Sequence, residues 1–164
     1  MATPPDHTPD PRPGARAILI GGLAAGTLDI LDAVIFSYLW RGVSPTRVLQ
    51  AIASGLLGRT AFDGGLATAA LGLALHFFIA LTAATVYVSV SRRAAVLVRH
   101  PVPSGIAYGI AVYFAMQHIV IPLSAFRAAA FAWPSFVNGV LIHIFGVGLP
   151  IALSHRLAGR LAAD

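Results

Sequence analysis

Five side chains that can bind metals or exchange protons lie within strongly apolar stretches of the sequence. They are Asp29, Asp32, His76, His118 and His143. An ionisable residue inside a membrane span is costly, because hydrocarbon solvates charge poorly, and such residues often mark a functional site. Carboxylate oxygens and imidazole nitrogens are ligands for divalent metals, and imidazole titrates near neutral pH. The residue types therefore predict either a metal site or a path for protons.

Four apolar runs hold these side chains, and each run is long enough to cross a bilayer. A spanning helix needs about 20 mostly apolar residues. The runs cover residues 17–40, 64–90, 103–125 and 134–154, and the segments between them carry nearly all the charge. Short connections place neighbouring helices antiparallel. We therefore expect an all-α polytopic membrane protein, with one antiparallel four-helix bundle in residues 16–160 and a disordered Pro- and Asp-rich tail in residues 1–15.

The composition of the whole chain agrees with a membrane protein. Of 164 residues, 57% are hydrophobic and 10% are charged, whereas about a quarter of the residues in a typical globular domain are charged. All eleven basic residues are Arg and all six acidic residues are Asp, so the chain lacks the Lys and Glu that usually cover a soluble surface. It also has no Cys, which excludes a disulfide scaffold and any thiolate metal or redox site.

The distribution of arginine predicts which side of the membrane each connection faces. The predicted tail, the second connection and the C-terminal segment carry Arg12, Arg16, Arg92, Arg93, Arg99, Arg156 and Arg160, against Arg41, Arg47, Arg59 and Arg127 on the other side. Because cytoplasmic segments carry the excess of basic residues, we expect both termini in the cytoplasm. His100 and His155 lie beside arginines at helix ends on that side and are expected to be solvated. The arginines form no clustered basic face, so the expected partner is the lipid bilayer and not a nucleic acid.

The first connection, residues 41–63, has the features of a short amphipathic helix. Ser44 is a suitable N-cap and Pro45 suits the first helical position. The expected apolar stripe is Val48, Leu49, Ile52 and Leu56, and the expected polar stripe is Arg47, Gln50 and Ser54. We expect this helix at the non-cytoplasmic interface, either packed across the mouth of the bundle or acting as a lid. Trp40 and Trp133, at helix ends on the same side, fit interfacial anchoring.

Depth and facing both predict that the five ionisable residues converge. At about 1.5 Å per residue, all five fall in one slab roughly 8 Å thick, just outward of the bilayer midplane. Asp32 lies one turn after Asp29, and small residues lie three, four or seven positions from Asp29 and from each of the three His. Small residues mark the sides on which membrane helices approach closely. Gly22 and Gly26 precede Asp29 in this way. We therefore expect all five side chains in the bundle interior.

A divalent metal is one interpretation of this group. Three His and one Asp would complete a tetrahedral shell for Zn or Fe, with the second Asp as a supporting acceptor or a further ligand. The chain lacks a dense ligand motif such as H-E-x-x-H, so each helix would contribute separately. Gln117 and Asn138 lie within the runs and could donate hydrogen bonds to the same group.

Three further interpretations stay open. Asp and His chains inside spans are typical of proton relays, and Pro122 and Pro150 could interrupt two helices as in transporters, which for so small a chain would favour a homo-oligomer. A b-type haem between two axial His is a lower-ranked alternative, because an adjacent Asp pair would be unusual. The group could also be purely structural, with each interhelical hydrogen bond contributing on the order of 1 kcal/mol. No G-x-S-x-G elbow or phosphate loop points to an enzyme.

Roughly the last hundred residues resemble the YagU-like group of small, largely uncharacterised bacterial inner-membrane proteins. The similar features are His76 with the aromatic and aliphatic run to Tyr87, Gln117-His118 followed by Pro122-Leu123, and His143 within Leu141-Ile142-His143-Ile144-Phe145. Asp29 and Asp32 have no counterpart in that pattern. The resemblance implies a multi-pass bundle in the bacterial inner (plasma) membrane, with a His in each of three helices and no established activity.

Overall fold

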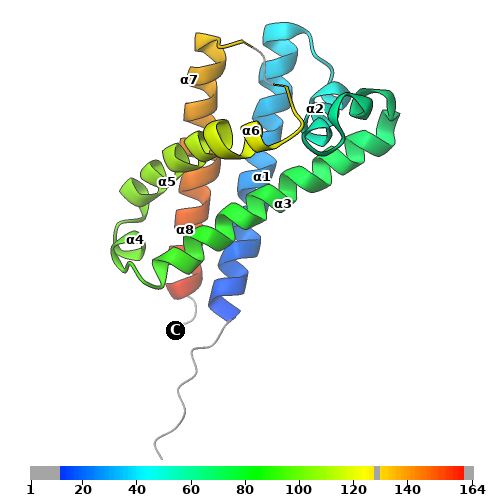
Figure 1. Cartoon of the computed structure of the whole chain (residues 1–164). Helices are drawn as coiled ribbons and strands as arrows, with labels where there is room; N and C mark the ends of the chain where they lie inside the picture. The colour runs from blue at the N-terminus through cyan, green and yellow to red at the C-terminus, as the bar shows by residue number, and fades with distance from the viewer. Residues whose placement is uncertain (1–11, 128–129, 161–164) are drawn as a thin grey trace, which may run out of the picture.

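The computed structural model describes residues 12–127 and 130–160, and within these residues it is helical with no strand (Figure 1). The elements are α1 (Arg12–Arg41), α2 (Pro45–Leu57), η1 (Gly58–Asp63), α3 (Gly65–Ser91), α4 (Val96–Arg99), α5 (Pro101–Ala115), η2 (Met116–Val120), α6 (Ile121–Leu123), α7 (Trp133–Ile142), η3 (His143–Gly148) and α8 (Leu149–Arg160). The segment η1 is a 3₁₀ turn, whereas η2 and η3 are π-helical turns within longer helices.

Four of these helices are long and apolar enough to cross a membrane. They are Gly14–Arg41, Gly65–Ser91, Pro101–Leu123 and Trp133–Gly159. The four predicted spans and the all-α class are therefore confirmed, and the chain is a multi-pass membrane protein. The helix α1 begins at Arg12, so residues 12–15 of the expected tail are helical; the rest of that tail lies outside the described residues.

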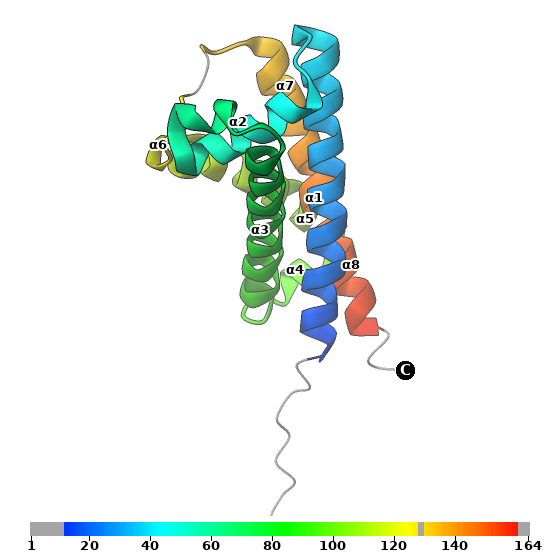
Figure 2. The same cartoon turned by 90° about the vertical axis from the view of Figure 1, so that its right-hand side faces the viewer.

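The spans pack in an order that follows from their contacts. The helix α1 packs against both α8 and α3, and α5 packs against η3 and α8. Figures 1 and 2 show α1 and the α7–α8 helix running side by side, with the inclined α3 crossing them. One end of the molecule holds α2 and α6, and we call it the α2 end; the other holds α4, the start of α1 and the end of α8, and we call it the α4 end.

Small residues allow the close approach of α5 to η3 that shapes the centre of the bundle. A Cβ on Gly109 would collide with the carbonyl group of His143, and one on Gly105 would lie 3.0 Å from the carbonyl oxygen of Gly148. Close backbone approach at small residues is a common way for membrane helices to associate, since lipid offers no hydrophobic drive between helices. The approach places the π-helical turn η3, and His143 at its start, next to α5.

The predicted amphipathic helix is present, but its buried face agrees only in part with the one expected: Val48 is buried and Arg47 exposed, as expected, whereas Gln50 and Ser54 are also buried. As predicted, Ser44 caps it, accepting a hydrogen bond from the Arg47 backbone N–H at 3.4 Å. Gln50 is buried and donates from Nε2 to the Gly65 carbonyl oxygen at 3.0 Å, whereas Leu56 is 64% exposed. The helix packs on α3, whose Gly72 leaves room for the Leu49 carbonyl. Gln50 is buried because α3 offers it acceptors, and Leu56 is left outward, as a lipid surface permits.

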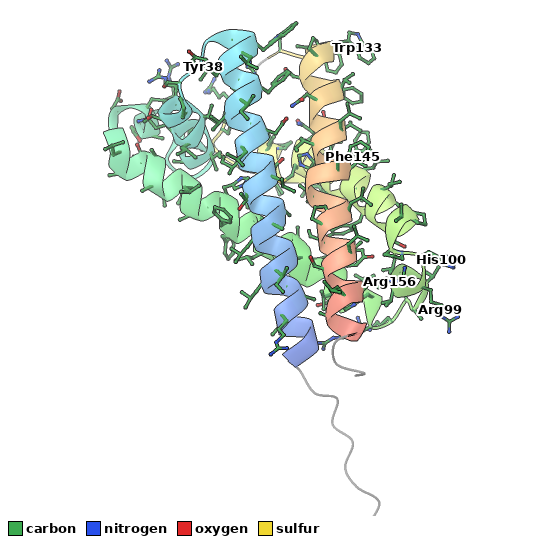
Figure 3. All side chains as sticks on the ribbon, turned by 180° about the vertical axis from the view of Figure 1, so that it is seen from behind. Tyr38, Arg99, His100, Trp133, Phe145 and Arg156 are labelled. Atoms are coloured by element: carbon green, nitrogen blue, oxygen red, sulfur yellow. The ribbon has the colours of Figure 1, made fainter. Side chains whose placement is uncertain are left out.

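The outer surface of the bundle agrees with a lipid environment. Large apolar side chains are exposed along every span, among them Leu66, Phe78, Leu123 and Phe145. Figure 3 shows Phe145 pointing outward at mid-height, Trp133 at the α2 end, and Arg99, His100 and Arg156 gathered at the α4 end. Exposed apolar area of this extent is unusual for a soluble monomer and is normal where lipid is the solvent.

Candidate intramembrane Asp/His site

Asp29 and His143 form the centre of the site. Asp29 lies midway along α1, and its Oδ1 is 4.0 Å from Nδ1 of His143 at the start of η3; the side chains are 24% and 16% exposed respectively. Among residues 12–127 and 130–160, no hydrogen-bond donor contacts the Asp29 carboxylate. The first and fourth spans thus bring a carboxylate and an imidazole together inside the membrane-spanning region, as the sequence predicts.

A backbone carbonyl fixes the tautomer of His143. Its Nδ1 lies 2.8 Å from the carbonyl oxygen of Gly139, one turn earlier. A carbonyl oxygen only accepts, so Nδ1 carries the proton in the neutral ring and Nε2 keeps its lone pair. The ring also meets Tyr113 of α5 edge to face, with centroids 5.4 Å apart. His143 is therefore held in one orientation beside Asp29, with one nitrogen available to take up a proton.

His76 approaches the same part of α1 from α3. Its Nε2 donates to the carbonyl oxygen of Gly26 at 2.8 Å, which leaves Nδ1 as the acceptor nitrogen. Gly26 lies one turn before Asp29, and Phe77 of α3 fills the space where a side chain at Gly26 would lie. The predicted convergence of His76 on the Asp29 face of α1 is confirmed by this contact.

Asp32 is held by a different partner. Its Oδ2 accepts a hydrogen bond of 2.7 Å from Nδ2 of Asn138, which joins α1 to α7. The expectation that Asn138 donates to the group is thereby confirmed. Asp32 lies one turn from Asp29, but its hydrogen bond to an amide gives it a defined interhelical role that Asp29 lacks.

His118 does not join the group. It is exposed and stacks nearly parallel on Phe114, with ring centroids 5.7 Å apart and 6° between the planes. It lies in the π-helical turn η2. The expectation that it faces the interior assumed 3.6 residues per turn, and a π-helical turn, with its wider i→i+5 spacing, shifts the facing of the residues in it. The prediction for His118 is therefore wrong in its facing.

The five predicted ligands do not assemble around one point. In the part of the chain that the structure describes, no group of three or more His, Cys, Asp or Glu side chains is placed to hold a metal ion. His118 lies on the surface, and Asp32 accepts a hydrogen bond from Asn138. His76 and His143 each use one ring nitrogen in a hydrogen bond to a backbone carbonyl oxygen. The geometry therefore gives the metal interpretation no support.

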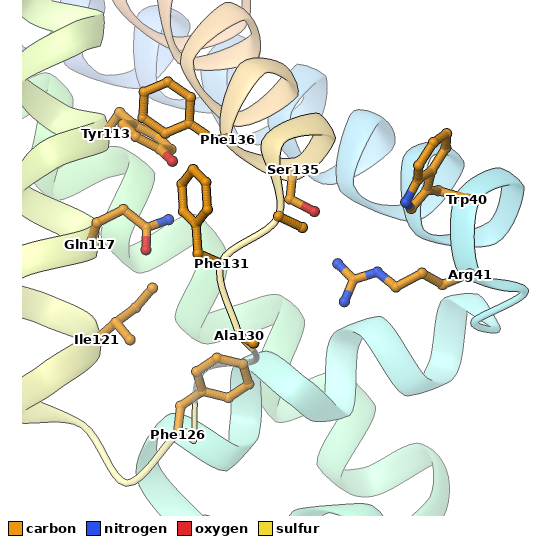
Figure 4. A pocket seen from close by; sticks show the side chains of 11 residues that line it. Trp40, Arg41, Tyr113, Gln117, Ile121, Phe126, Ala130, Phe131, Ser135 and Phe136 are labelled. Carbon is orange, nitrogen blue, oxygen red and sulfur yellow. The ribbon is translucent and has the colours of Figure 1, made fainter.

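A cavity of about 280 Å³ opens at the α2 end, next to the site. Its lining includes Tyr113, the same ring that packs against His143, together with Trp40 and Arg41 from the end of α1 and Phe131 and Phe136 around the start of α7 (Figure 4). Tyr113 is not one of the five residues that the sequence predicts for the site. Its three-way contact with the cavity, Phe136 and His143 is a product of the α5–η3 approach, which no local spacing reveals.

A second polar group lies nearer the α4 end. Tyr87 donates to the Leu97 carbonyl oxygen at 3.0 Å, and Tyr108 donates to the Ala83 carbonyl oxygen at 2.6 Å. Ser91 donates to the Val88 carbonyl oxygen and lies 2.7 Å from Nε2 of His155, which donates to it in return. His155 is thus part of the packed interior, with its Nδ1 buried and without a hydrogen-bond partner among the described residues, and the expectation that it is solvated is wrong. His100 is exposed, as expected.

The comparisons with known proteins supply no relative. No protein-family model, no curated protein and no solved structure matches the chain. The resemblance to the YagU-like group therefore stays a prediction.

Proposed function

We propose that this multi-pass membrane protein carries protons at the Asp29–His143 pair as part of a transport or relay activity. The observation that supports this most directly is the 4.0 Å approach of the Asp29 carboxylate to the His143 ring between two membrane-spanning helices. Groups of this kind are costly in a membrane, and packing alone requires no carboxylate without a hydrogen-bond donor.

Charge balance explains how one proton would be held there. With Asp29 ionised and His143 neutral, the pair has a net charge of −1, which a low-dielectric interior disfavours. One added proton makes the pair neutral, whether it sits on the carboxylate or on Nε2 of His143. The second arrangement places an imidazolium beside a carboxylate, which is favourable at this separation. The pair can therefore bind and release a single proton with little movement of the helices.

The neighbouring groups supply orientation and access. His76 and the Asp32–Asn138 bond join α3 and α7 to α1, on either side of the pair. The cavity at the α2 end approaches the pair through Tyr113, so water in that cavity would be the source or the acceptor of the proton. We place the α2 end outside and the α4 end in the cytoplasm, since the arginines favour the α4 end.

Proton flux into vesicles tests this function. The purified full chain is reconstituted in liposomes that contain a pH-sensitive dye, and a potassium diffusion potential drives protons inward. Flux above that of protein-free vesicles is expected for the wild type and for Asp63→Asn, an exposed acid in η1 used as the matched control. Asp29→Asn is expected to reduce the flux at least about tenfold. Wild-type flux equal to that of empty vesicles, or full flux in Asp29→Asn, contradicts the proposal.

The same preparation separates the other interpretations. Stoichiometric Zn or Fe that is lost in His143→Ala would assign the site to a metal, and a Soret band would assign it to haem. We propose that a transporter of this size is a homo-oligomer. Light scattering of the detergent-solubilised protein measures its oligomeric state.

A further inference from the structure

We propose that the cavity at the α2 end is a binding site for a compact organic monoanion, a carboxylate on an aromatic or similarly apolar body, with Arg41 as its counter-ion. The proposal depends on the cavity and its lining alone, so it stands whether or not the Asp29–His143 pair carries protons.

The walls of the cavity suit a flat apolar body. Aromatic side chains from three parts of the chain line it: Trp40, Tyr113, Phe126, Phe131 and Phe136. Several already pack on one another, with ring centroids 5.7 Å apart for Tyr113 and Phe136 and 5.9 Å apart for Phe131 and Phe136. A ligand ring can extend this set of aromatic contacts, which stabilise beyond what burial alone gives.

One charge defines the polar part of the cavity. Arg41 at the end of α1 is its only ionisable lining residue that is charged at neutral pH, and among the described residues it forms no ion pair. Figure 4 shows its guanidinium group directed into the cavity, with the Gln117 amide directed in from the opposite wall. A guanidinium presents a planar fork of donors that matches a carboxylate. The lining therefore has a positive charge, further donors in Gln117 and Ser135, and no acid to balance them.

The size and position of the cavity select the kind of anion. A volume of about 280 Å³ lies just below the range for small-molecule sites, which is about 300–1,000 Å³. It suits a single ring with a carboxylate and excludes a long acyl chain. The adjacent Trp40 is at the helix end, where an indole anchors at the membrane interface. The occupant is accordingly a compact anion that enters from the aqueous side.

Tryptophan fluorescence reports binding directly, because the chain has only two Trp and one of them lines the cavity. Trp133→Phe leaves Trp40 as the single reporter. This variant, reconstituted in zwitterionic lipid nanodiscs, is titrated with 4-nitrophenylacetate anion, whose nitro group quenches indole emission, and in parallel with the neutral 4-nitrophenylacetamide. We expect saturable quenching by the anion and at least about tenfold weaker binding of the neutral amide, because only the anion pairs with Arg41.

Substitutions then assign the contact to Arg41. Arg41→Gln is expected to weaken anion binding at least about tenfold, and Arg41→Lys to restore most of it, because Lys keeps the charge but lacks the fork. Arg59→Gln is the matched control, since Arg59 is exposed at the same end and does not line the cavity. Equal binding of anion and amide, unchanged binding in Arg41→Gln, or no saturable quenching each overturns the proposal. Saturable quenching by a brominated fatty acid but not by the aqueous anion would overturn it in favour of a lipid occupant.

Discussion

The two interior polar groups of this protein differ in the kind of side chain that lacks a hydrogen-bond partner. Near the α4 end, Tyr87, Tyr108 and Ser91 each donate to a backbone carbonyl, and among the described residues the unpartnered atom is an imidazole nitrogen, Nδ1 of His155. Near the middle of α1, by contrast, Asp29 is a carboxylate with an imidazole at 4.0 Å and no donor among the described residues. The tyrosine hydrogen bonds near the α4 end join helices, whereas a carboxylate kept in a membrane interior without a donor requires another explanation.

The sharpest test of this contrast compares one substitution in each group. Asp29→Asn removes the charge that attracts a proton to His143, so proton flux per folded protein should fall at least about tenfold, while Tyr108→Phe should leave flux within about twofold. The dye-loaded liposomes described above measure both variants, with the folded fraction taken from size-exclusion chromatography. Equal losses in the two variants would mean that the two groups do not differ in function.

Moving η3 away from α5 should damage the site without changing any of its ionisable residues. Gly109→Val places two methyl groups against the His143 carbonyl, where there is no space. Overpacking of this kind costs about 1–3 kcal/mol, and the displaced His143 should also lower the flux. Thermal unfolding in detergent, followed by circular dichroism, gives the stability change. Gly159→Val is the control, because a Cβ there meets nothing within 4 Å; equal destabilisation of both would show that the α5–η3 approach is not the cause.

Substitutions in the polar group near the α4 end, which includes Tyr87, Tyr108 and Ser91, should lower the stability of the protein and leave its proton flux unchanged. Tyr108→Phe removes the hydrogen bond to the Ala83 carbonyl oxygen that joins α5 to α3. A hydrogen bond between membrane helices contributes on the order of 1 kcal/mol, so the unfolding temperature should fall by a few degrees. Thr82→Val is the matched control, since Thr82 bonds only to Phe78 within its own helix. A loss of flux at unchanged stability would give this group a functional role and remove the contrast.

The sequence was sufficient for the four apolar helices and for the convergence of His76 and His143 on the Asp29 region of α1. It was insufficient for the facing of several side chains. Ser44 and Pro45 mark the start of α2 through local capping, which sequence shows directly. Its buried face was assigned correctly at Val48 and wrongly at Gln50 and Leu56, because Gln50 finds its acceptor on α3 and lipid accepts the exposed Leu56. Hydrophobic periodicity distinguishes interior from exterior only when water is the solvent outside, and a membrane removes that distinction.

The π-helical turns explain why the sequence could not predict the facing of His118 and His143. Both η2 and η3 carry one of the predicted His residues, and in each the 3.6-residue rule no longer relates facing to spacing. At η3 the outcome agrees with the prediction, because Gly109 lets the turn lie against α5 with His143 inward. At η2 it does not, and His118 lies outside. Neither turn has a local sequence signal that would have separated the two cases.

We expect the smallest effect at His118, which the sequence predicts as a site residue together with the other four. His118 contacts Phe114 on the exposed side of the bundle and contributes nothing to the Asp29–His143 pair. His118→Ala should leave proton flux within about twofold of the wild type, and loss of one exposed ring contact should cost no more than about 0.5–1.5 kcal/mol. His143→Ala, measured in the same vesicles, should lose flux. If His118→Ala instead loses flux as His143→Ala does, His118 must reach the interior in a second conformation of η2, and the site would then be larger than the pair described here.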